Sequence, residues 1–505
     1  MEGSMAALNF LPTSMAGATL MIISILFLLI SRQSKRRRPN LPPSPPSLPF
    51  IGHLHLLKLA LHRTLQTLST KYGPIFSLTL GARNVVVVSS PSLAEECLQQ
   101  NDVVFANRPH SILGWKILAY NYTSIGAAPY GPHWRNLRRL SAVELLSAPR
   151  LNSFLHVRTD EVTRLVNGLV ADVSAGSGFG KVEMKLRLVG LSMNMVMRMV
   201  AGKRYFGTSE EKEGRDEEEE GEEFKELIRE AFELSGTSNH VDFLPVLKWV
   251  DFSGLEQRMW RAHRKMDAFF QGLIDEHRSS RLQKEEEEQE DGVGRLSRKT
   301  MIDTMLTLQE SEPENYSDDI IKEILDKARA EIDNAVGNNR LVQESDCIDL
   351  PYLQCIISET FRLYPVGPLL IPHQSSEDCT VGGYFVSKET MLFVNTWAIH
   401  RDPTVWKDPT RFWPERHSEG EANAYQLLPF GAGRRSCPGI ALANRTVSVA
   451  LGTLIQCFEW KRVGEELLDM TEGPGLTMPK LEPLEALCKP RKFMEDVLIT
   501  VQGDK

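Results

Sequence analysis

A lone cysteine near the C-terminal end of the chain carries the clearest chemical signal. Cys437 follows Phe430, Gly433, Arg434 and Arg435, and another glycine comes two residues after it. Glycines on both sides let the backbone bend tightly and approach a large flat ligand. The apolar run that follows predicts a buried helix with a proline in its first turn. Unpaired amides at its N-terminus, the helix dipole and the two arginines favour a thiolate at this position.

A thiolate is a metal ligand, and its surroundings indicate which metal. No second cysteine or histidine lies close to Cys437 in the sequence, which argues against zinc. One sulfur suffices for an iron whose other four ligands come from a macrocycle. A buried free cysteine beside a glycine-rich turn is the alternative.

The spacing of Phe430, glycine, arginine, Cys437 and glycine resembles the haem-thiolate loop of the cytochromes P450. The resemblance implies that Cys437 is the axial ligand of a haem b iron, that Phe430 packs near the sulfur and that Arg435 pairs with a haem propionate.

Trp134 and Arg138 are one helical turn apart on one face. They resemble the pair that cytochromes P450 offer to a propionate, although an amphipathic helix with a solvated arginine gives the same pattern.

A second resemblance lies in a set of charged residues. Glu359 and Arg362 are three residues apart in a predicted helix, close enough for an ion pair, although an exposed pair contributes little. With the later Arg416 they resemble the buried charge network of cytochromes P450, in which loss of one member costs several kcal/mol. The resemblance also places His373 at a propionate. His417 stands where the family usually has phenylalanine, so we expect weaker packing behind Arg416.

Composition sets limits on the class of protein. The 505 residues are 42% hydrophobic, which supports a large core, and we expect one large domain. The 58 basic and 66 acidic residues give a net charge of -8, which argues against a nucleic-acid partner. The 7 cysteines are scattered and without CxxC spacing, so we expect no disulfide framework and a reducing compartment.

The N-terminal region predicts a membrane anchor. Residues 11–31 are mostly apolar and about the length that spans a bilayer, and basic residues follow them, which predicts a cytoplasmic main domain. A cleavable signal would have its basic residues first. Residues 32–50 form a basic, proline-rich hinge, for which an SH3-type ligand is the alternative. Residues 51–505 then form the haem domain.

The resemblance implies a mainly α fold with small β-sheets. The sequence predicts a hairpin at 75–80 and 85–89, further strands at 384–386 and 391–395, and a helix at 353–363. The acidic runs 217–223 and 285–291 are interpreted as solvated loops between helices. By resemblance, 366–371 and 473–478 line the substrate pocket.

One family element is missing from the sequence. Cytochromes P450 carry a central distal helix with the motif Ala/Gly-Gly-x-Asp/Glu-Thr, whose acid and alcohol deliver protons during oxygen activation. Here Ile324, in a segment like the entry to that helix, runs directly into Leu325, in a segment like a later helix. About 30 residues, or about 45 Å of helix, are absent by this comparison. A mis-joined gene model or splice product, a protein that has lost activity, and a haem protein with another role are the three explanations.

The segments 106–109 and 372–379 look like those of the plant family 81 group of cytochromes P450. The resemblance implies hydroxylation of a small aromatic plant metabolite, isoflavonoid-like, with O2 and electrons from NADPH-cytochrome P450 reductase. It also implies a location at the endoplasmic reticulum membrane, with the haem domain cytoplasmic. A non-catalytic, membrane-anchored haem protein or an inactive variant is the alternative.

Overall fold

The computed structural model describes residues 40–494, except 59, 111, 174–177, 208–214, 236–239, 246, 248–253, 292–327, 330, 338–339, 419–423, 465–468 and 474–476. The predicted anchor at 11–31, the first part of the hinge at 32–39 and the junction Ile324–Leu325 lie outside these residues. The described α-helices are α2 Leu61–Tyr72, α3 Pro91–Glu95, α4 Leu113–Leu118, α5 Pro132–Leu140, α6 Ala148–Ser153, α7 Leu155–Val173, α8 Met184–Ala201, α9 Arg215–Ser235, α10 His240–Phe243, α11 Leu255–Asp291, α14 Pro351–Leu363, α15 Thr396–Ile399 and α16 Ile440–Cys457.

Three small sheets accompany the helices, as the mainly α fold class predicts. Their strand orders are β1-β2-β7-β4, β3-β9-β8 and β5-β6. The strands are β1 Ile75–Leu80, β2 Arg83–Val88, β3 Gly180–Glu183, β4 His373–Gln374, β5 Cys379–Val381, β6 Tyr384–Val386, β7 Met391–Val394, β8 Phe458–Lys461 and β9 Glu485–Pro490. The predicted hairpin is confirmed, with Ile75 opposite Val88 in an antiparallel pair. Strand β2 also pairs with β7 in parallel, so segments about 300 residues apart form one sheet.

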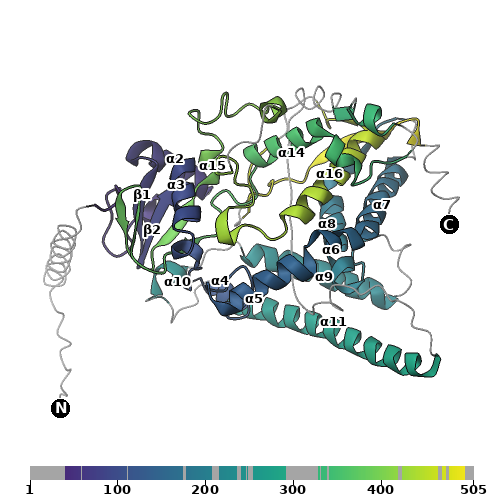
Figure 1. Cartoon of the computed structure of the whole chain (residues 1–505), viewed down its shortest axis with the longest axis horizontal. Helices are drawn as coiled ribbons and strands as arrows, with labels where there is room; N and C mark the ends of the chain where they lie inside the picture. The colour runs from purple at the N-terminus through teal and green to yellow at the C-terminus, as the bar shows by residue number, and fades with distance from the viewer. Residues whose placement is uncertain are drawn as a thin grey trace, which may run out of the picture.

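The sheet and the helical core lie on opposite sides of the segment that precedes α16. Figure 1 shows β1, β2, α2 and α3 on one side, and α7, α8, α14 and α16 on the other. The largest hydrophobic cluster joins α7, α8, α14 and α16, whereas a second cluster packs the sheet against α3. The chain before α16 is therefore fixed from both sides.

Helix α16 is long and apolar enough to cross a membrane, with a mean hydropathy of 1.3. Half of it is buried, and Val449, Leu454 and Ile455 belong to the largest core cluster. In the described part of the chain it is therefore a core helix. The apolar run after Cys437, residues 440–458, was predicted to form this helix. The helix ends at Cys457, and Phe458 begins strand β8.

The interpretation of the two acidic runs as loops is wrong. Residues 217–223 lie inside α9, and residues 285–291 form the last turns of α11. Glutamate is a good helix former, and in α9 the run lies in the first turns, where the helix dipole favours negative charge. Solvation by itself did not distinguish an exposed helix from a loop.

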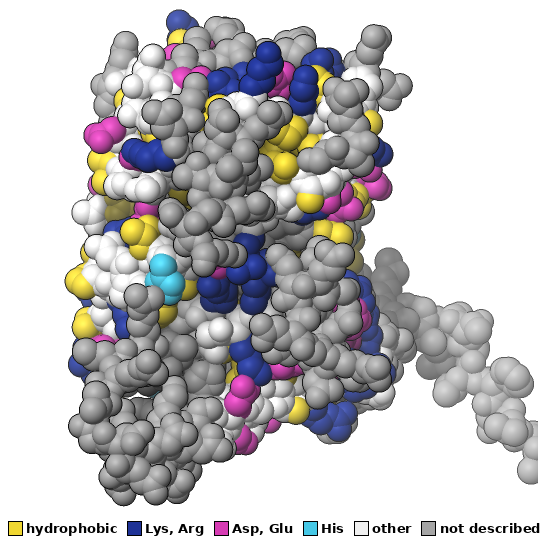
Figure 2. All heavy atoms as spheres, turned by 90° about the vertical axis from the view of Figure 1, so that its right-hand side faces the viewer, with side chains coloured by type: hydrophobic (Ala, Val, Ile, Leu, Met, Phe, Trp, Pro, Cys, Tyr) yellow, Lys and Arg dark blue, Asp and Glu magenta, His cyan; other side chains and the backbone are white. Residues whose placement is uncertain are grey.

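The face at the right-hand end of Figure 1 is mixed in charge. Figure 2 shows basic and acidic side chains on it, with hydrophobic side chains scattered between them. A nucleic-acid site needs a continuous basic surface. The described part of this face does not have that character.

Candidate functional site

The loop before α16 is held in a fixed shape around Cys437. The Cys437 amide donates to the Phe430 carbonyl at 2.9 Å, which closes the loop. Gly431 and Gly433 have φ angles of +68° and +66°, in the left-handed region that favours glycine. A Cβ on Gly433 would lie 2.0 Å from the Leu98 carbonyl oxygen, so a side chain there has no room.

The start of α16 differs slightly from the prediction. The helix begins at Ile440 with Gly439 as its N-cap, so Pro438 precedes the helix instead of lying in its first turn. Gly439 has an ordinary φ of -88°, and a Cβ on it would lie 3.8 Å from the Cys437 sulfur. Cys437 is therefore three residues before the helix, partly exposed and unbonded to other cysteines.

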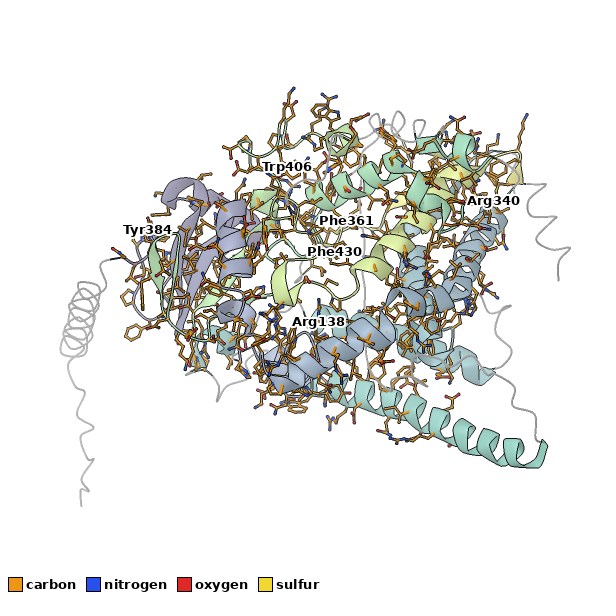
Figure 3. All side chains as sticks on the ribbon, viewed as in Figure 1. Arg138, Arg340, Phe361, Tyr384, Trp406 and Phe430 are labelled. Carbon is orange, nitrogen blue, oxygen red and sulfur yellow. The ribbon has the colours of Figure 1, made fainter. Side chains whose placement is uncertain are left out.

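An aromatic pair supports the loop. The ring centroids of Phe430 and Phe361 lie 5.2 Å apart at 75°, an edge-to-face contact between the loop and α14. Figure 3 shows both rings pointing toward one another between the two elements, with Arg138 on the far side of the loop. Phe430 thus lies at the start of the cysteine loop with its ring fixed by α14.

Helix α5 brings Trp134 and Arg138 to the same loop. Arg138 donates to the Ser436 carbonyl at 2.6 Å and to the Ser436 hydroxyl at 3.2 Å, directly beside Cys437. The guanidinium of Arg435 lies 4.4 Å from the centre of the Trp134 ring. The Trp134 indole N–H donates to the Ile125 carbonyl at 3.1 Å. The two residues, predicted to share one helix face, therefore both reach the segment around Cys437.

Arg108 is a neighbour of this group that the sequence did not identify as a site residue. It is buried, and its guanidinium donates to the carbonyls of Gly126, Ile371 and Pro372. Burial, together with the charge of Arg435, lowers the pKa of Arg108 to about 9. Arg108 lies in the segment 106–109, which resembles plant family 81 but had no predicted role in the site.

His373 is buried beside these arginines. Its Nδ1 lies 2.8 Å from the Phe105 carbonyl oxygen and donates to it. Burial, together with the charges of Arg108 and Arg435, holds the pKa of His373 well below its usual value. The imidazole is therefore neutral and adds no positive charge to the group.

The positive charge of the arginines around the loop is not balanced by carboxylates among the described residues. Burial, together with the charge of Arg138 beside it, lowers the pKa of Arg435 to about 10. Arg435 donates to the carbonyls of Ala106, Ile125 and Ala128, and within the described residues neither it, Arg108 nor Arg138 forms an ion pair with a carboxylate. Half-buried cations without anions are costly. A ligand with two carboxylates would neutralise this group.

The predicted charge network makes direct contacts. Glu359 and Arg362 are both fully buried, and Arg362 donates Nε and Nη2 to the two carboxylate oxygens at 2.8 and 2.9 Å. Arg416 donates to the same carboxylate at 3.0 Å, and the Trp413 amide does so at 2.8 Å. Burial alone would raise the pKa of Glu359, but these hydrogen bonds and that of His417 outweigh it and lower the pKa to about 2.

His417 has a different role from the one expected. Instead of leaving a gap in the packing, its Nε2 donates to Glu359 at 2.9 Å, and its ring lies 5.8 Å from that of Trp406. A phenylalanine would provide the ring contact but not the hydrogen bond. His417 is thus a fourth member of the network, which the sequence comparison could not show.

His400 links the network to the cysteine loop, a role that no sequence pattern indicates. Its Nδ1 donates to the Arg362 carbonyl at 3.0 Å, and its Nε2 accepts from the Leu428 amide at 2.9 Å, two residues before Phe430. Burial, together with the charges of Arg401 and Arg362, lowers the pKa of His400 to about 3. The neutral ring therefore bridges two segments that are about 65 residues apart.

A mainly helical fold with a single cysteine loop, flanked by cations that lack anions, is the arrangement of a haem-thiolate protein. The family model for cytochrome P450 matches residues 42–326 and 321–484. Cytochrome P450 81Q32 of Catharanthus roseus is 51% identical, over 99% of each chain. An isoflavone 3'-hydroxylase of Medicago truncatula is 48% identical, over 94% of this chain and 97% of its own. A (+)-piperitol/(+)-sesamin synthase of Sesamum radiatum is 47% identical, over 90% and 91%.

The chain belongs to the cytochrome P450 family, whose members bind haem b and act as monooxygenases. The residues around the loop fit that cofactor. A haem carries two carboxylates, and its iron takes a ligand from the protein, which a cysteine thiolate would supply. In the described residues, three guanidiniums without a carboxylate partner lie around the loop that carries Cys437, and their charge matches these two carboxylates.

The comparisons also bear on the missing helix. The two matches to the family model meet at 321–326, which includes the junction Ile324–Leu325. The alignment with the Catharanthus roseus protein covers 527 positions, 22 more than the 505 residues of this chain. At least 22 aligned positions of that relative thus have no counterpart here. Both observations agree with an internal segment that the family has and this chain lacks.

Proposed function

We propose that this chain is a membrane-anchored monooxygenase that hydroxylates a small aromatic plant metabolite at a haem held by Cys437. Haem b bound through a thiolate supplies the iron at which oxygen is activated. The observation that carries the proposal is the group of guanidiniums around the closed cysteine loop, which have no carboxylate partner among the described residues. They would remain uncompensated in the folded protein unless a dianionic ligand bound there.

In this proposal each residue of the loop region has one task. Cys437 supplies the sulfur, and the hydrogen bond between its amide and the Phe430 carbonyl fixes the direction of the loop. The contact of Phe430 with Phe361 holds the Phe430 ring at the start of the loop. Arg138 and Arg435 bind the propionates by charge-assisted hydrogen bonds, which are the stronger kind.

Trp134, His373 and Arg108 complete the propionate site in this proposal. The Trp134 ring supports the Arg435 guanidinium, so it orients that cation. Neutral His373 donates to a backbone carbonyl through Nδ1, which leaves Nε2 as its second hydrogen-bonding atom. Arg108 adds a positive charge that is buried and fixed by three carbonyls. Glu359, Arg362 and Arg416 hold the chain behind the loop.

The substrate class follows from the relatives and is a proposal for this chain. One relative is named an isoflavone 3'-hydroxylase, and another a (+)-piperitol/(+)-sesamin synthase. Segments 366–371 and 473–478 would contact the substrate, of which 474–476 lie outside the described residues. The Met478 amide donates to the Val366 carbonyl at 3.1 Å, so the described parts of the two segments adjoin.

The membrane arrangement is also proposed. Residues 11–31 would anchor the chain in the endoplasmic reticulum, residues 32–50 would form the hinge, and residues 51–505 would face the cytoplasm. NADPH-cytochrome P450 reductase would supply the electrons. Arg434 lies partly exposed beside the loop and pairs with Asp102 at 2.7 Å, so its charge is already partly compensated.

A second function is favoured by the split family match and the alignment that is longer than the chain. Without the acid and threonine of the distal helix, the proton path is incomplete, and water has freer access to the cofactor. The chain would then bind haem without productive turnover, as a passive haem protein or an inactive splice or gene-model variant.

A carbon monoxide difference spectrum of the reduced, membrane-bound chain separates these functions. A thiolate-type Soret band together with hydroxylation of an isoflavone, measured by mass spectrometry, supports the monooxygenase. The band without product supports the passive haem protein, and no band refutes both.

Restoring the missing segment is a sharper test. We would insert the corresponding residues of the Medicago truncatula isoflavone 3'-hydroxylase between Ile324 and Leu325. If the absent proton path limits the chain, product formed per NADPH consumed should rise at least tenfold over the natural chain. An unchanged ratio in a variant with a normal difference spectrum would show that the junction does not limit turnover.

A further inference from the structure

A cavity of about 350 Å³ lies away from the cysteine loop, between α2, the end of α14, α15 and the described residues 470, 472 and 478–480. Its size is within the range of small-molecule sites. None of the residues around Cys437 lines it. The residues that decide its chemistry are Arg63, Trp397, Arg401, Met470, Glu472 and Lys480.

The wall of the cavity carries an excess of positive charge. Arg63, Arg401 and Lys480 are cationic, whereas Glu472 is the one carboxylate among its described lining residues. Glu472 is already engaged, because its two oxygens lie 2.6 Å from Arg63 Nη2 and 3.2 Å from His62 Nε2. Arg401 makes no ion pair within the described residues. An anion is therefore the ligand that the charges favour.

Two residues of this wall each have a buried donor without an acceptor among the described residues. The indole Nε1 of Trp397 and the Nη1 of Arg401 are both buried without a hydrogen-bond partner in the described part of the chain. Trp397 is only 8% exposed. Buried donors of this kind are normally satisfied by water or by a ligand. Since one donor belongs to a guanidinium, a carboxylate or phosphate satisfies it better than a neutral acceptor.

The same wall combines an aromatic ring, which two guanidiniums approach, with apolar side chains. The guanidiniums of Arg401 and Arg63 lie 4.2 and 5.2 Å from the centre of the Trp397 ring, so two like charges gather at one aromatic surface. Burial, together with the charges of Arg362 and Arg63, lowers the pKa of Arg401 to about 10. Met470 and Met478 line the cavity as well and suit an apolar group.

We infer that this cavity binds an amphipathic anion, with its carboxylate or phosphate against Arg63, Arg401 and the Trp397 indole, and its apolar part against the methionines. The anionic group would come either from a free organic acid or from an anionic lipid of the membrane. The inference does not depend on the haem proposal, because it uses none of the residues that hold the cofactor; Met478 is the one lining residue that also belongs to a segment proposed to contact the substrate.

The test uses the full chain in a non-ionic detergent, titrated with octanoate and, in parallel, with octanol. Octanoate should change the tryptophan fluorescence saturably, whereas octanol, which has the same apolar chain without the charge, should bind at least tenfold more weakly. Arg63→Gln should weaken octanoate binding about fivefold, because one charge-assisted contact is lost. Lys71→Gln removes the same charge from an exposed position on α2 outside the cavity and should leave binding unchanged.

Glu472→Gln provides a variant with the opposite sign. It removes the carboxylate that competes for Arg63, so octanoate should bind more tightly, an outcome that misfolding cannot produce. Equal binding of octanol and octanoate, or identical affinities for the natural chain, Arg63→Gln and Glu472→Gln, would overturn the inference and leave a water-filled structural void.

A comparison of lipid discs identifies the source of the anion. With phosphatidylcholine discs as the reference, phosphatidic acid in the disc should weaken octanoate binding several-fold if a lipid phosphate occupies the site. Unchanged octanoate affinity would assign the site to a free acid. Both results support an anion site, because each requires saturable octanoate binding.

Discussion

Replacement of Glu359 by glutamine tests the charge network through its pH dependence. Glu359 is fully buried and accepts hydrogen bonds from Arg362, Arg416, His417 and the Trp413 amide. Its pKa falls from 4.5 to about 2 in the folded protein. Each pKa unit is worth about 1.4 kcal/mol, so the carboxylate contributes about 3 kcal/mol to the free energy of unfolding at neutral pH.

The sign of the pH dependence follows from the direction of this shift. A carboxylate with a lowered pKa stabilises the fold above its unfolded value, and this contribution is lost as the pH falls from 4.5 to about 2. Urea unfolding of the natural chain, followed by circular dichroism, should lose about 3 kcal/mol over this range. Glu359→Gln should already be less stable by a similar amount at pH 7, and it should lack the loss due to this group.

Glu226→Gln is the matched control. Glu226 pairs with Arg229 on the exposed side of α9, so the same chemical change should leave the unfolding midpoint unchanged. If Glu359→Gln kept both the neutral stability and the acid-induced loss of the natural chain, the buried network would not stabilise the fold in the way proposed.

Three further changes test single contacts. His417→Phe restores the residue usual in the family but removes the hydrogen bond to Glu359, so the free energy of unfolding should fall by about 1 kcal/mol; a more stable variant would contradict this role. Gly433→Ala should cost about 2 kcal/mol or more, measured by urea unfolding, because of its positive φ and the Leu98 carbonyl; an unaffected midpoint would speak against a fixed loop. Arg435→Gln should speed haem transfer to apomyoglobin about fivefold, and equal transfer rates would remove Arg435 from the propionate site.

The local elements followed from the sequence where the pattern was strong. The hairpin of β1 and β2 was predicted from two β-rich runs around a glycine turn, and Gly81 indeed has a positive φ of +58°. The helix that carries Glu359 and Arg362 was predicted over 353–363 and begins two residues earlier, at Pro351. In both cases the information lies within a few neighbouring residues.

Long-range contacts were accessible only where a family pattern existed. Arg108 donates to carbonyls more than 260 residues away, so its place beside His373 depends on the packing of distant segments. His400 likewise bridges Arg362 and Leu428 as a neutral ring, and no local pattern indicates this role. The acidic run in α9 was misassigned because charge density alone gives no helix period.

Ligation of iron by the sulfur of Cys437 is the central claim, and the most direct measurement compares the natural chain with Cys437→Ala. Both chains would be expressed in full length with haem supplied, and iron content and the reduced carbon monoxide spectrum would be recorded together. The natural chain should contain about one iron per chain and show the thiolate-type Soret band. Cys437→Ala should lose that band and most of the iron. An unchanged spectrum and iron content in the variant would contradict the account.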